Sequence, residues 1–396
     1  MTAPWLALAL VAAVLGVAPL VLAVRFRRFV LRALAADPPP YMPRVSIILP
    51  CKGVDPDFEA NLRSILQQDY PWYEVVVAVA SGEDPALGVA RRLAADSSVP
   101  VRVVVAGPAS GRSQKVNNQL HALPHLDPTS EAIVCVDSDT RMGPHFLRHL
   151  VAPLTDPGVG MTTGYRWYHP PRPSLAGLLR STWNGGALPL LIVNRYAFVF
   201  GGGMAIRREV FERARVAEAW EHAATDDFPM AGAVRRLGLS IRFVPQCLGV
   251  SDDEMCLGDV VAWTNRQTTI CRVYRPALWW AITLGHAGSN LLMLLGLASA
   301  AGALLSGAAW LWWGALLLTP LVAEIADALL LLPVVGRMLP QEAATLRRRR
   351  WIYAALAPVA SLLMVVNTVR SVLSNRIRWR GVTYELRGPS ETVVHA

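Results

Sequence analysis

Charged side chains are scarce in this sequence of 396 residues. Asp, Glu, Lys and Arg together make up 17% of the chain, whereas hydrophobic residues make up 53%. Soluble domains usually carry charge on about a quarter of their residues, so the composition argues against a protein that is soluble throughout. The apolar residues concentrate near the N-terminus and after Trp279. The middle of the chain therefore reads as a soluble domain between membrane segments.

Cysteine pairs that could form a disulfide framework or hold zinc are also lacking. The five cysteines are scattered, with no CxxC pair and no Cys/His spacing suited to zinc. We therefore expect no disulfide framework, which agrees with a domain that faces the cytosol.

The net charge of +9 does not take the form of a basic stripe with interleaved aromatic residues, so nucleic acid is not expected as a partner. The basic clusters lie beside the apolar stretches instead. Arg25, Arg27 and Arg28 follow the first stretch, and Arg347 to Arg350 lie near the last. This placement fits the positive-inside rule and a phospholipid bilayer with anionic headgroups. The internal repeats expected of a transporter are lacking as well.

The apolar run from Trp5 to Val24 is long enough to span a bilayer as a helix. Positive charge follows this run rather than preceding it, which is the reverse of a cleaved signal peptide. We therefore expect a membrane anchor whose C-terminal end lies in the cytosol. The expected domain order is an anchor at 1–28, a linker at 29–42, a cytosolic catalytic domain at 43–275, membrane helices at 276–375 and a basic tail at 376–396.

Three apolar stretches near the C-terminus complicate the membrane topology. They are Trp279 to Leu305, Ala308 to Val335 and Trp351 to Val369. Glu324 and Asp327 lie in the second stretch, where a carboxylate is costly in lipid and should face protein or water. With the anchor, four crossings would place the basic tail outside the cytosol, against the positive-inside rule. One segment, the charged second or the weaker third, is therefore expected to be interfacial or re-entrant.

The middle of the chain alternates short apolar strands with helical stretches. The expected strands include Val45 to Pro50, Glu74 to Ala80, Val101 to Val105 and Ala132 to Val136. This alternation predicts an α/β domain with a mostly parallel sheet. Ligands of such sheets bind beyond the carboxyl ends of the strands, which is where the acidic residues Asp84, Asp137 and Asp139 occur.

Asp137-Ser138-Asp139 follows a strand that is apolar throughout. Two carboxylates at this spacing can converge on one divalent cation if the chain bends there. Hard oxygen ligands suit Mg²⁺ or Mn²⁺, and such an ion leaves room for substrate phosphates. Ordinary turn chemistry is the alternative interpretation.

Four further stretches each allow two interpretations. Lys115 near a helix start suits an anionic group or is an ordinary polar residue. Gly201 to Gly203 form a floor under a bulky sugar or acceptor, or a flexible turn. Asp226 presents a general base or caps a helix. The segment from Trp263 to Arg275 offers cations to a diphosphate, or belongs to a membrane-interface belt, or both.

Taken in order, the motifs of this chain resemble the ceramide glucosyltransferase-like branch of the family 2 glycosyltransferases. The resemblance runs from about residue 43 to 275, with membrane segments in matching places. The matching stretches are Pro50 to Pro56, Gln68 to Val75, Asp84-Pro85-Ala86, Lys115 to Asn118, Asp137-Ser138, Gly202-Gly203-Met204, Asp226 and, in the tail, Trp379-Arg380-Gly381 with Tyr384.

The resemblance implies an inverting enzyme with a GT-A-like, Rossmann-like fold. In that family Asp84 would contact the uracil or ribose, Asp137 and Asp139 would hold Mg²⁺ or Mn²⁺ with the diphosphate, and Asp226 would be the catalytic base. Further nucleotide-sugar contacts are expected from Lys52, Lys115, Asn118 and Arg266, and acceptor contacts from Gly202, Gly203, Trp263 and Gln267.

Two departures from the family pattern bear on the acceptor and the metal. The family's final motif ends in Arg-Trp, whereas Arg266 is followed here by Gln267. This leaves an acceptor other than ceramide open and argues mildly against a processive polysaccharide synthase. Asp139 stands where ceramide enzymes often have glycine, which brings the Asp-Ser-Asp segment closer to the general family pattern.

The expected function is therefore a glycosyltransferase that moves one hexose from a UDP-sugar to a membrane lipid acceptor. Diacylglycerol, ceramide, a hopanoid or another lipid alcohol would serve as the acceptor. The enzyme is expected to be a multi-pass protein of the cell membrane with its catalytic domain in the cytoplasm. A processive polysaccharide synthase is the alternative, and a non-catalytic membrane scaffold is a more remote one.

Overall fold

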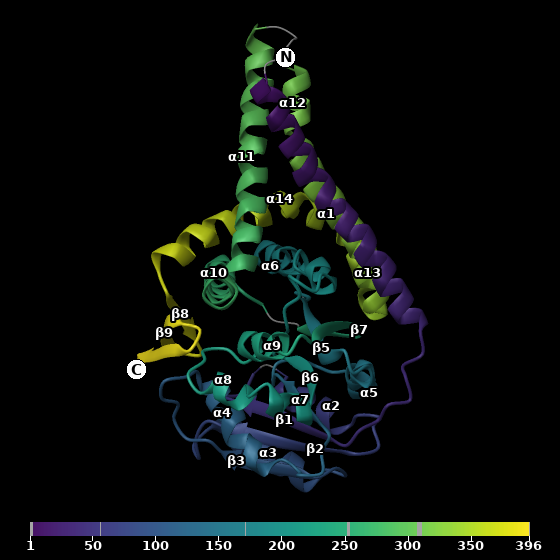
Figure 1. Ribbon diagram of the computed structural model, residues 1–396, viewed down its shortest axis with the longest axis vertical. Coiled ribbons are helices and arrows are strands. Elements are labelled where there is room, and N and C mark those ends of the chain that lie inside the picture. Colours follow the sequence, from purple (N-terminus) through teal and green to yellow (C-terminus); the bar gives the residue numbers. More distant parts are fainter. Residues whose placement is uncertain (1–2, 56, 171, 252–253, 307–310, 396) are drawn as a thin grey trace. The chain divides into compact units, whose positions relative to one another are not determined.

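The structure is a computed structural model that describes residues 3–55, 57–170, 172–251, 254–306 and 311–395 (Figure 1). Pro56 of the first matching motif and residues 308–310 of the second apolar stretch lie outside the described residues. The chain divides into two compact units. The helical unit comprises Met1–Arg32, Pro170–Pro189 and Glu254–Ser374, and the sheet unit comprises Ala33–His169, Leu190–Asp253 and Asn375–Ala396.

The sheet unit is built on a seven-stranded sheet with the order β3-β2-β1-β4-β6-β5-β7. The strands are β1 Val45–Cys51, β2 Tyr73–Val79, β3 Val101–Val105, β4 Ala132–Val136, β5 Val159–Tyr168, β6 Gly203–Arg207 and β7 Ser240–Ser251. Strands β1 to β4 run parallel, β6 is antiparallel to both β4 and β5, and β5 pairs parallel with β7. The mostly parallel α/β sheet expected from the sequence is confirmed.

Helices cover both faces of this sheet. They are α2 Phe58–Leu66, α3 Pro85–Ala95, α4 Gln114–Ala122, α5 Phe146–Val151, α7 Arg208–Arg213, α8 Val216–Trp220 and α9 Asp227–Arg236. Ile47 and Leu49 of β1 pack into a core with residues of α2, α3 and α5, whereas Ile48 packs into a second core with residues of α4, α7, α8 and α9. Successive side chains of β1 enter opposite cores, which explains why nearly every position of this strand is apolar.

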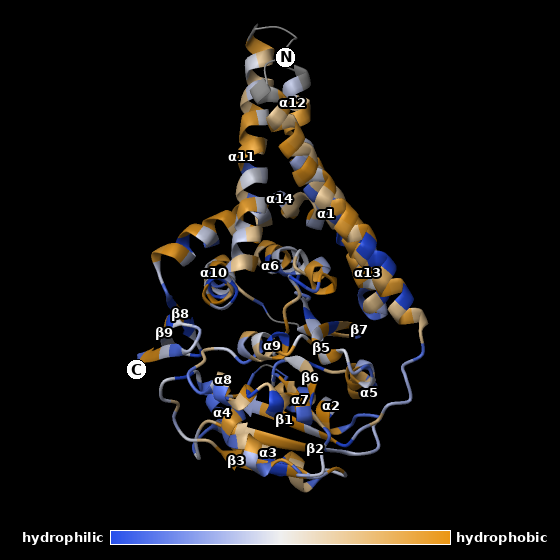
Figure 2. Cartoon of the chain, in the orientation of Figure 1, coloured by the Kyte–Doolittle hydropathy of each residue, from blue (hydrophilic) through white to orange (hydrophobic). Residues whose placement is uncertain are grey.

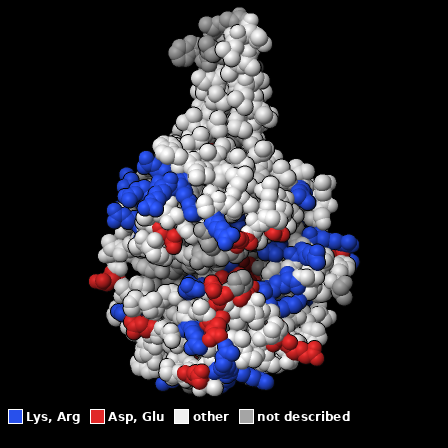
Figure 3. Space-filling view, turned by 180° about the vertical axis from the view of Figure 1, so that it is seen from behind, with Lys and Arg blue, Asp and Glu red and all other residues white. Residues whose placement is uncertain are grey.

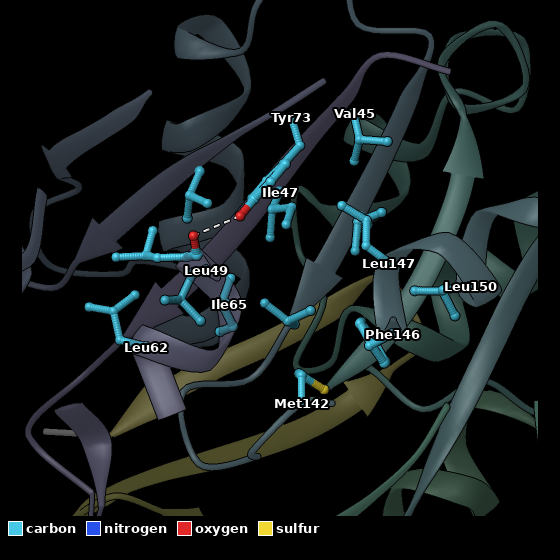
Figure 4. Packing of buried hydrophobic residues seen from close by; sticks show 14 of the residues in the cluster. Val45, Ile47, Leu49, Leu62, Ile65, Tyr73, Met142, Phe146, Leu147 and Leu150 are labelled. Atoms are coloured by element: carbon cyan, nitrogen blue, oxygen red, sulfur yellow. Dashed lines mark hydrogen bonds between the residues drawn. The ribbon is translucent and has the colours of Figure 1, made fainter. Parts of the chain in front are cut away.

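Figure 4 shows the first of these cores at close range. Leu62 and Ile65 of α2 and Phe146 of α5 lie among the strand residues, all of them nearly inaccessible to solvent. The Tyr73 hydroxyl donates a hydrogen bond of 2.8 Å to the carbonyl oxygen of Leu66. This bond connects the start of β2 to the end of α2 and so helps to fix the position of β2 in the sheet.

The C-terminal tail forms a small sheet of its own within the sheet unit. Strands β8 Arg376–Trp379, β9 Val382–Gly388 and β10 Glu391–His395 pair antiparallel in the order β10-β9-β8. Tyr384 and Leu386 of β9 are buried. The sequence pattern predicted only a basic tail here, so this sheet is a finding of the structure.

The helical unit contains most of α1 Ala3–Ala35, together with α6 Leu175–Gly185, α10 Leu257–Tyr274, α11 Pro276–Ser306, α12 Leu311–Leu317, α13 Thr319–Met338 and α14 Ala343–Leu373. Four described segments are long and apolar enough to cross a membrane: Leu6–Ala35, Pro276–Leu305, Thr319–Met338 and Pro340–Leu373. Figure 2 shows α11 and α1 with mostly hydrophobic residues, and Figure 3 shows much of the surface of this unit without charge. Four apolar helices suggest membrane association, as the composition predicts.

The polar residues of these helices contact one another. His286 Nδ1 and Asn290 Nδ2 of α11 each lie 2.9 Å from the Ser361 hydroxyl of α14. Glu324 of α13 interacts with the same Ser361 side chain. Glu324 therefore faces protein, as expected for a carboxylic acid within an apolar segment.

Candidate active site

Acidic residues from two distant parts of the sequence meet at one end of the sheet. The ammonium group of Lys115, at the start of α4, lies 2.8 Å from Asp137 Oδ1 and 3.0 Å from Asp226 Oδ1. Asp137 and Asp139 follow β4, and Asp226 precedes α9. Because Lys115 contacts both Asp137 and Asp226, it holds the ends of two separate elements together.

A second cation, the guanidinium of Arg166 on β5, bridges the two carboxylates that follow β4. Its Nη2 lies 3.2 Å from Asp137 Oδ2 and 2.5 Å from Asp139 Oδ1, while its Nη1 lies 2.9 Å from Asp139 Oδ2. Phe200 lies beside this guanidinium, with 4.9 Å between the ring centre and Cζ. We call Lys115, Asp137, Asp139, Arg166 and Asp226 the ion cluster. It holds three carboxylates and two cations.

The contacts of the Asp226 side chain argue against the capping interpretation given above. Asp226 is the N-cap residue of α9, but its side chain makes no capping hydrogen bond. Its Oδ2 instead accepts a 2.7 Å hydrogen bond from the Gln119 amide of α4. The residue is 1% exposed, and its backbone carbonyl accepts a bond from the Trp220 indole. A carboxylate buried at a helix start and turned toward charged groups is not serving as a simple cap.

Burial and neighbouring charges set the pKa values in the ion cluster. Burial raises the pKa of Asp137, and Lys115 opposes this shift. Burial would also raise the pKa of Asp139, but Arg166 overcomes it and lowers the pKa to about 2. The pKa of Lys115 is raised, because Asp137 and Asp226 outweigh the effect of burial. Lys115 and Asp139 are therefore charged at neutral pH.

Asp227, the next residue after Asp226, has a different electrostatic environment. Burial and the charge of Asp226 raise the pKa of Asp227 to about 7. Its Oδ1 accepts hydrogen bonds from the Thr225 hydroxyl at 2.5 Å and from the Phe228 backbone at 2.7 Å. Asp227 therefore titrates near neutral pH beside the ion cluster.

The glycines that precede β6 leave the room that these side chains occupy. A Cβ atom on Gly201 would lie 2.7 Å from Lys115 Nζ and from Asp226 Oδ1. A Cβ atom on Gly202 would lie 2.6 Å from Asp137 Oδ2 and 2.3 Å from the Phe200 ring. The backbone at these two positions thus approaches the ion cluster as closely as glycine allows.

The Asp84 carboxylate follows strand β2, which β1 separates from β4, and is held by backbone groups. Its Oδ1 accepts hydrogen bonds of 3.0 Å from Gly53 N and from Ala86 N, so it also caps α3. Asn118 Nδ2 donates to the carbonyl oxygens of Cys51 and Ala78, which joins the ends of β1 and β2.

The residues after β1 connect this region to the ion cluster. Ser138 lies between Asp137 and Asp139 in the predicted metal motif, and its hydroxyl donates a 2.9 Å hydrogen bond to Asp55 Oδ2. Burial raises the pKa of the Cys51 thiol, and Asp84, Asp55 and Asp137 raise it further. Lys52 lies in the same loop, and burial followed by repulsion from Arg380 lowers its pKa.

The fit of a divalent cation can be judged from the two carboxylates of Asp137 and Asp139. They lie close enough to share one cation, because both contact the same nitrogen of Arg166. Their oxygens suit Mg²⁺ or Mn²⁺. Among the described residues there is no group of three or more His, Cys, Asp or Glu side chains arranged for a metal. A metal at these acids would therefore need oxygens from a ligand and a shift of Arg166.

Three predicted site residues lie on α10 in the helical unit. The Trp263 ring packs edge-on against Trp183, with ring centres 5.5 Å apart, and Arg180 lies 4.8 Å from its centre. The expected roles of Trp263, Arg266 and Gln267 in binding donor or acceptor remain predictions.

The motifs used in the sequence analysis do not include Arg166, Gln119, Asp55 and Arg380 as site residues, although all four contact predicted site residues or their loops. Arg166 occurs in an aromatic stretch from which no site was predicted. Arg380 belongs to a motif that was noted in the tail without a role. Only spatial proximity reveals these four residues.

Comparisons with known proteins concern the family and the fold of the chain. The profile of a family described as glycosyl transferase family 21 matches residues 6–391. A ceramide glucosyltransferase of Komagataella phaffii is 46% identical over 55 residues, which cover 14% of this chain and 11% of that protein. Ceramide glucosyltransferase 1 of Caenorhabditis elegans is 32% identical over 87 residues, which cover 22% of this chain and 19% of that protein. The aligned stretches thus span less than a fifth of either relative.

Among solved structures, a mannosyltransferase of Pyrobaculum calidifontis in complex with GDP-Man and Mn²⁺ resembles the chain with a TM-score of 0.51. The match covers 92% of this chain and 99% of that one, at 20% identity, and therefore concerns the fold. The GT-A-like fold expected from the sequence is confirmed, and so is the resemblance to the ceramide glucosyltransferases.

Proposed function

Because this chain belongs to glycosyltransferase family 21, we propose that it transfers one hexose from a UDP-sugar to the hydroxyl group of a membrane lipid, with inversion at the anomeric carbon. One observation carries the proposal. A nearly inaccessible carboxylate, Asp226, shares the cation Lys115 with Asp137 of the metal motif. A base and a diphosphate site are thereby joined through one side chain.

Asp226 is the base of the proposed reaction. Its carboxylate takes the proton of the acceptor hydroxyl while that oxygen attacks the anomeric carbon of the sugar. The bond between this carbon and the phosphate oxygen breaks, and its electron pair leaves with UDP. Gln119 and Lys115 hold the two carboxylate oxygens in place, which fixes the direction from which the acceptor is deprotonated.

In the proposed reaction Lys115 and Arg166 stabilise the negative charge that develops on the leaving group. Both cations already bind carboxylates. A diphosphate that enters the ion cluster would replace these carboxylates as their anionic partner. Asp137 and Asp139 would hold Mg²⁺ or Mn²⁺, which when bound neutralises charge on the diphosphate. Asp84, Lys52 and the Gly53 loop are assigned to the nucleoside side of the donor.

The lipid acceptor is supported by the four apolar helices and by the ceramide glucosyltransferase name of the two relatives. Tethering of a catalytic domain to a bilayer raises the effective concentration of a lipid hydroxyl at its surface. We assign the catalytic domain to the cytoplasm, because Arg25, Arg27 and Arg28 follow the apolar part of α1.

The tail sheet bears on the number of membrane crossings. Since β8 to β10 belong to the same compact unit as the ion cluster, the chain between them should cross the bilayer an even number of times. Three candidate helices lie in that interval. We assign α14 to the membrane surface for two reasons. Its first half carries Arg347 to Arg350, and its axis runs across the axis of α11 in Figure 1. This choice would place the basic tail in the cytoplasm and resolve the conflict found in the sequence.

The test is a transfer assay with the full chain in membranes. Labelled UDP-glucose, UDP-galactose and UDP-N-acetylglucosamine are supplied in turn, and lipids are extracted. We expect label from one donor in a lipid that carries a single sugar. Label in a high-mass polymer would instead identify a polysaccharide synthase, and no incorporation from any of the three donors would contradict the proposal.

A further inference from the structure

The turn between β8 and β9 brings a cation from the far end of the chain to the donor side of the sheet unit. Trp379 pairs with Val382, so Arg380 and Gly381 form a two-residue hairpin loop. Both have positive φ angles, 46° and 80°. Arginine rarely adopts this conformation, which costs of the order of 1 kcal/mol. The turn thus has an arginine at a position where glycine or asparagine would adopt the backbone conformation at lower energy.

The Arg380 side chain binds the loop that follows β1. Its Nη1 donates a 2.9 Å hydrogen bond to the carbonyl oxygen of Lys52, and its Nη2 forms an ion pair with Asp55. The next residue in that loop, Gly53, donates its amide to Asp84. The same Asp55 carboxylate accepts the hydroxyl of Ser138. One guanidinium therefore fixes a loop that contacts both the Asp84 region and the metal motif.

The rest of the tail sheet docks on two other loops at the same end of the large sheet. The Tyr384 hydroxyl accepts a 3.3 Å hydrogen bond from the backbone of Gln114, the residue before Lys115. The Thr392 hydroxyl donates a 2.8 Å bond to the carbonyl oxygen of His222, four residues before Asp226. Each of the three docking points thus lies within four residues of a predicted site residue.

From these contacts we infer that Arg380, in the turn between β8 and β9, is a positioning residue for the donor site. Arg380 holds the Lys52 to Asp55 loop, so that Gly53, Asp84 and Ser138 keep their relative places for a nucleoside diphosphate. Its positive charge also adds to that of Lys52 beside the site. The inference rests on the proposed function, because it names how the donor of that reaction is held.

A purely structural role for the tail predicts something different. A hairpin that only stabilises the fold would, when weakened, lower the melting temperature without a selective change in nucleotide affinity. A positioning residue changes the dissociation constant and the KM of the nucleotide while kcat stays nearly constant. The two roles are therefore separated by comparing binding with stability in the same variants.

The experiment measures binding of UDP, with GDP as a second probe, by titration calorimetry of the full chain in detergent. Arg380→Ala should bind UDP at least about tenfold more weakly than the unmodified chain. Arg380→Lys should fall between the two, because it keeps the charge but loses the two-nitrogen geometry. The matched control is Arg387→Ala on β9, whose side chain is 53% exposed and pairs with Glu385 and Glu391. This control should leave UDP binding unchanged.

The inference is overturned if Arg380→Ala binds UDP within twofold of the unmodified chain, or if Arg387→Ala weakens binding equally. It is also overturned if the unmodified chain binds neither nucleotide. Should Arg380→Ala fail to fold, Arg380→Lys decides, with unchanged affinity counting against the inference. Lipid labelling is scored separately, so a chain that binds UDP through Arg380 but labels no lipid would contradict the proposed function alone.

Discussion

Asp84 and Asp137 follow two parallel strands of one sheet, β2 and β4, which flank β1, yet their partners differ in kind. Backbone amides hold Asp84, whereas the side-chain cations Lys115 and Arg166 hold Asp137. Backbone partners keep their place whatever is bound, but side-chain cations can exchange one anion for another. We infer that the Asp84 region keeps one geometry when a ligand binds. In the ion cluster, by contrast, the cations can change their anionic partners.

This comparison assigns different kinetic effects to the two regions. Changes in the ion cluster should act on the chemical step and therefore on kcat. Changes near Asp84 should act on donor binding and therefore on KM. The predictions below begin with the largest expected effect.

Asp226→Asn should lower kcat by roughly 10³-fold, because the amide has almost the same size but cannot accept the acceptor proton. UDP binding should stay within a few-fold, since Asp226 does not hold the nucleotide in the proposed reaction. Single-turnover lipid labelling and UDP titration measure the two effects. Retention of a tenth or more of the turnover would remove Asp226 from its assigned role.

Lys115→Met should lower kcat by about 10²-fold and also lower the melting temperature. The substitution leaves Asp137 and Asp226 without their shared cation, and loss of one partner of a buried ion pair typically costs about 3–5 kcal/mol. Lys115→Arg keeps the charge and serves as the control, with a smaller loss expected. Equal losses in both variants would show that charge is not the property that matters at this position.

Gly202→Ala should lower kcat by about 10–100-fold, because its Cβ would meet Asp137 Oδ2 at 2.6 Å and displace it. Gly88→Ala on α3 is the matched control, since nothing lies within 4 Å of its added Cβ. Steady-state labelling of both variants tests the prediction. Similar activity in the two would mean that the ion cluster tolerates displacement.

Asp84→Asn should raise the KM for the donor about tenfold while kcat changes little, because a hydrogen bond to a charged group contributes roughly 1.5–3 kcal/mol. The amide oxygen can still cap α3, so the melting temperature should fall only slightly. Donor titrations under saturating acceptor give both constants. A fall in kcat without a change in KM would erase the distinction between the two regions.

Asp227→Asn should change how stability depends on pH. Asp227 has a pKa of about 7 in the folded protein, whereas an aspartate in an unfolded chain has a pKa near 3.9. Between these values the folded state binds a proton that the unfolded state has released, so the stability from this group is lost as the pH rises toward 7. From pH 5 to pH 8 the melting temperature of the unmodified chain should fall relative to the variant. Parallel curves would contradict the assignment.

Much of the sheet was predictable because several of its strands are continuous apolar runs in the sequence. The continuous apolar runs that become β1, β2 and β4 are buried on both faces, and a short run that is apolar at every position is typical of a strand inside a parallel sheet. Strand β5 was not predicted. Its sequence, VGMTTGYRWY, lacks such a run, and its burial depends on pairing with β6 and β7, which no local pattern reveals.

The candidate site was predictable in its acidic residues and in Lys115, but not in its arginines. Asp137, Asp139 and Asp226 stand in recognisable motifs, whereas Arg166 lies on the unpredicted strand β5. Arg380 reaches the site from more than 300 residues away through the tail sheet. Alternation of polar and apolar residues from Arg376 to Trp379 is a signal that could have indicated β8. Its docking partner could not be derived from the sequence.

The most direct test of the account is a structure of the full chain with UDP and Mn²⁺. We predict that the diphosphate lies within hydrogen-bonding distance of Lys115, that Mn²⁺ contacts Asp137 and Asp139, and that Arg166 has shifted from its present position between them. A nucleotide bound away from the ion cluster, with Lys115 still pairing Asp137 and Asp226, would contradict the account.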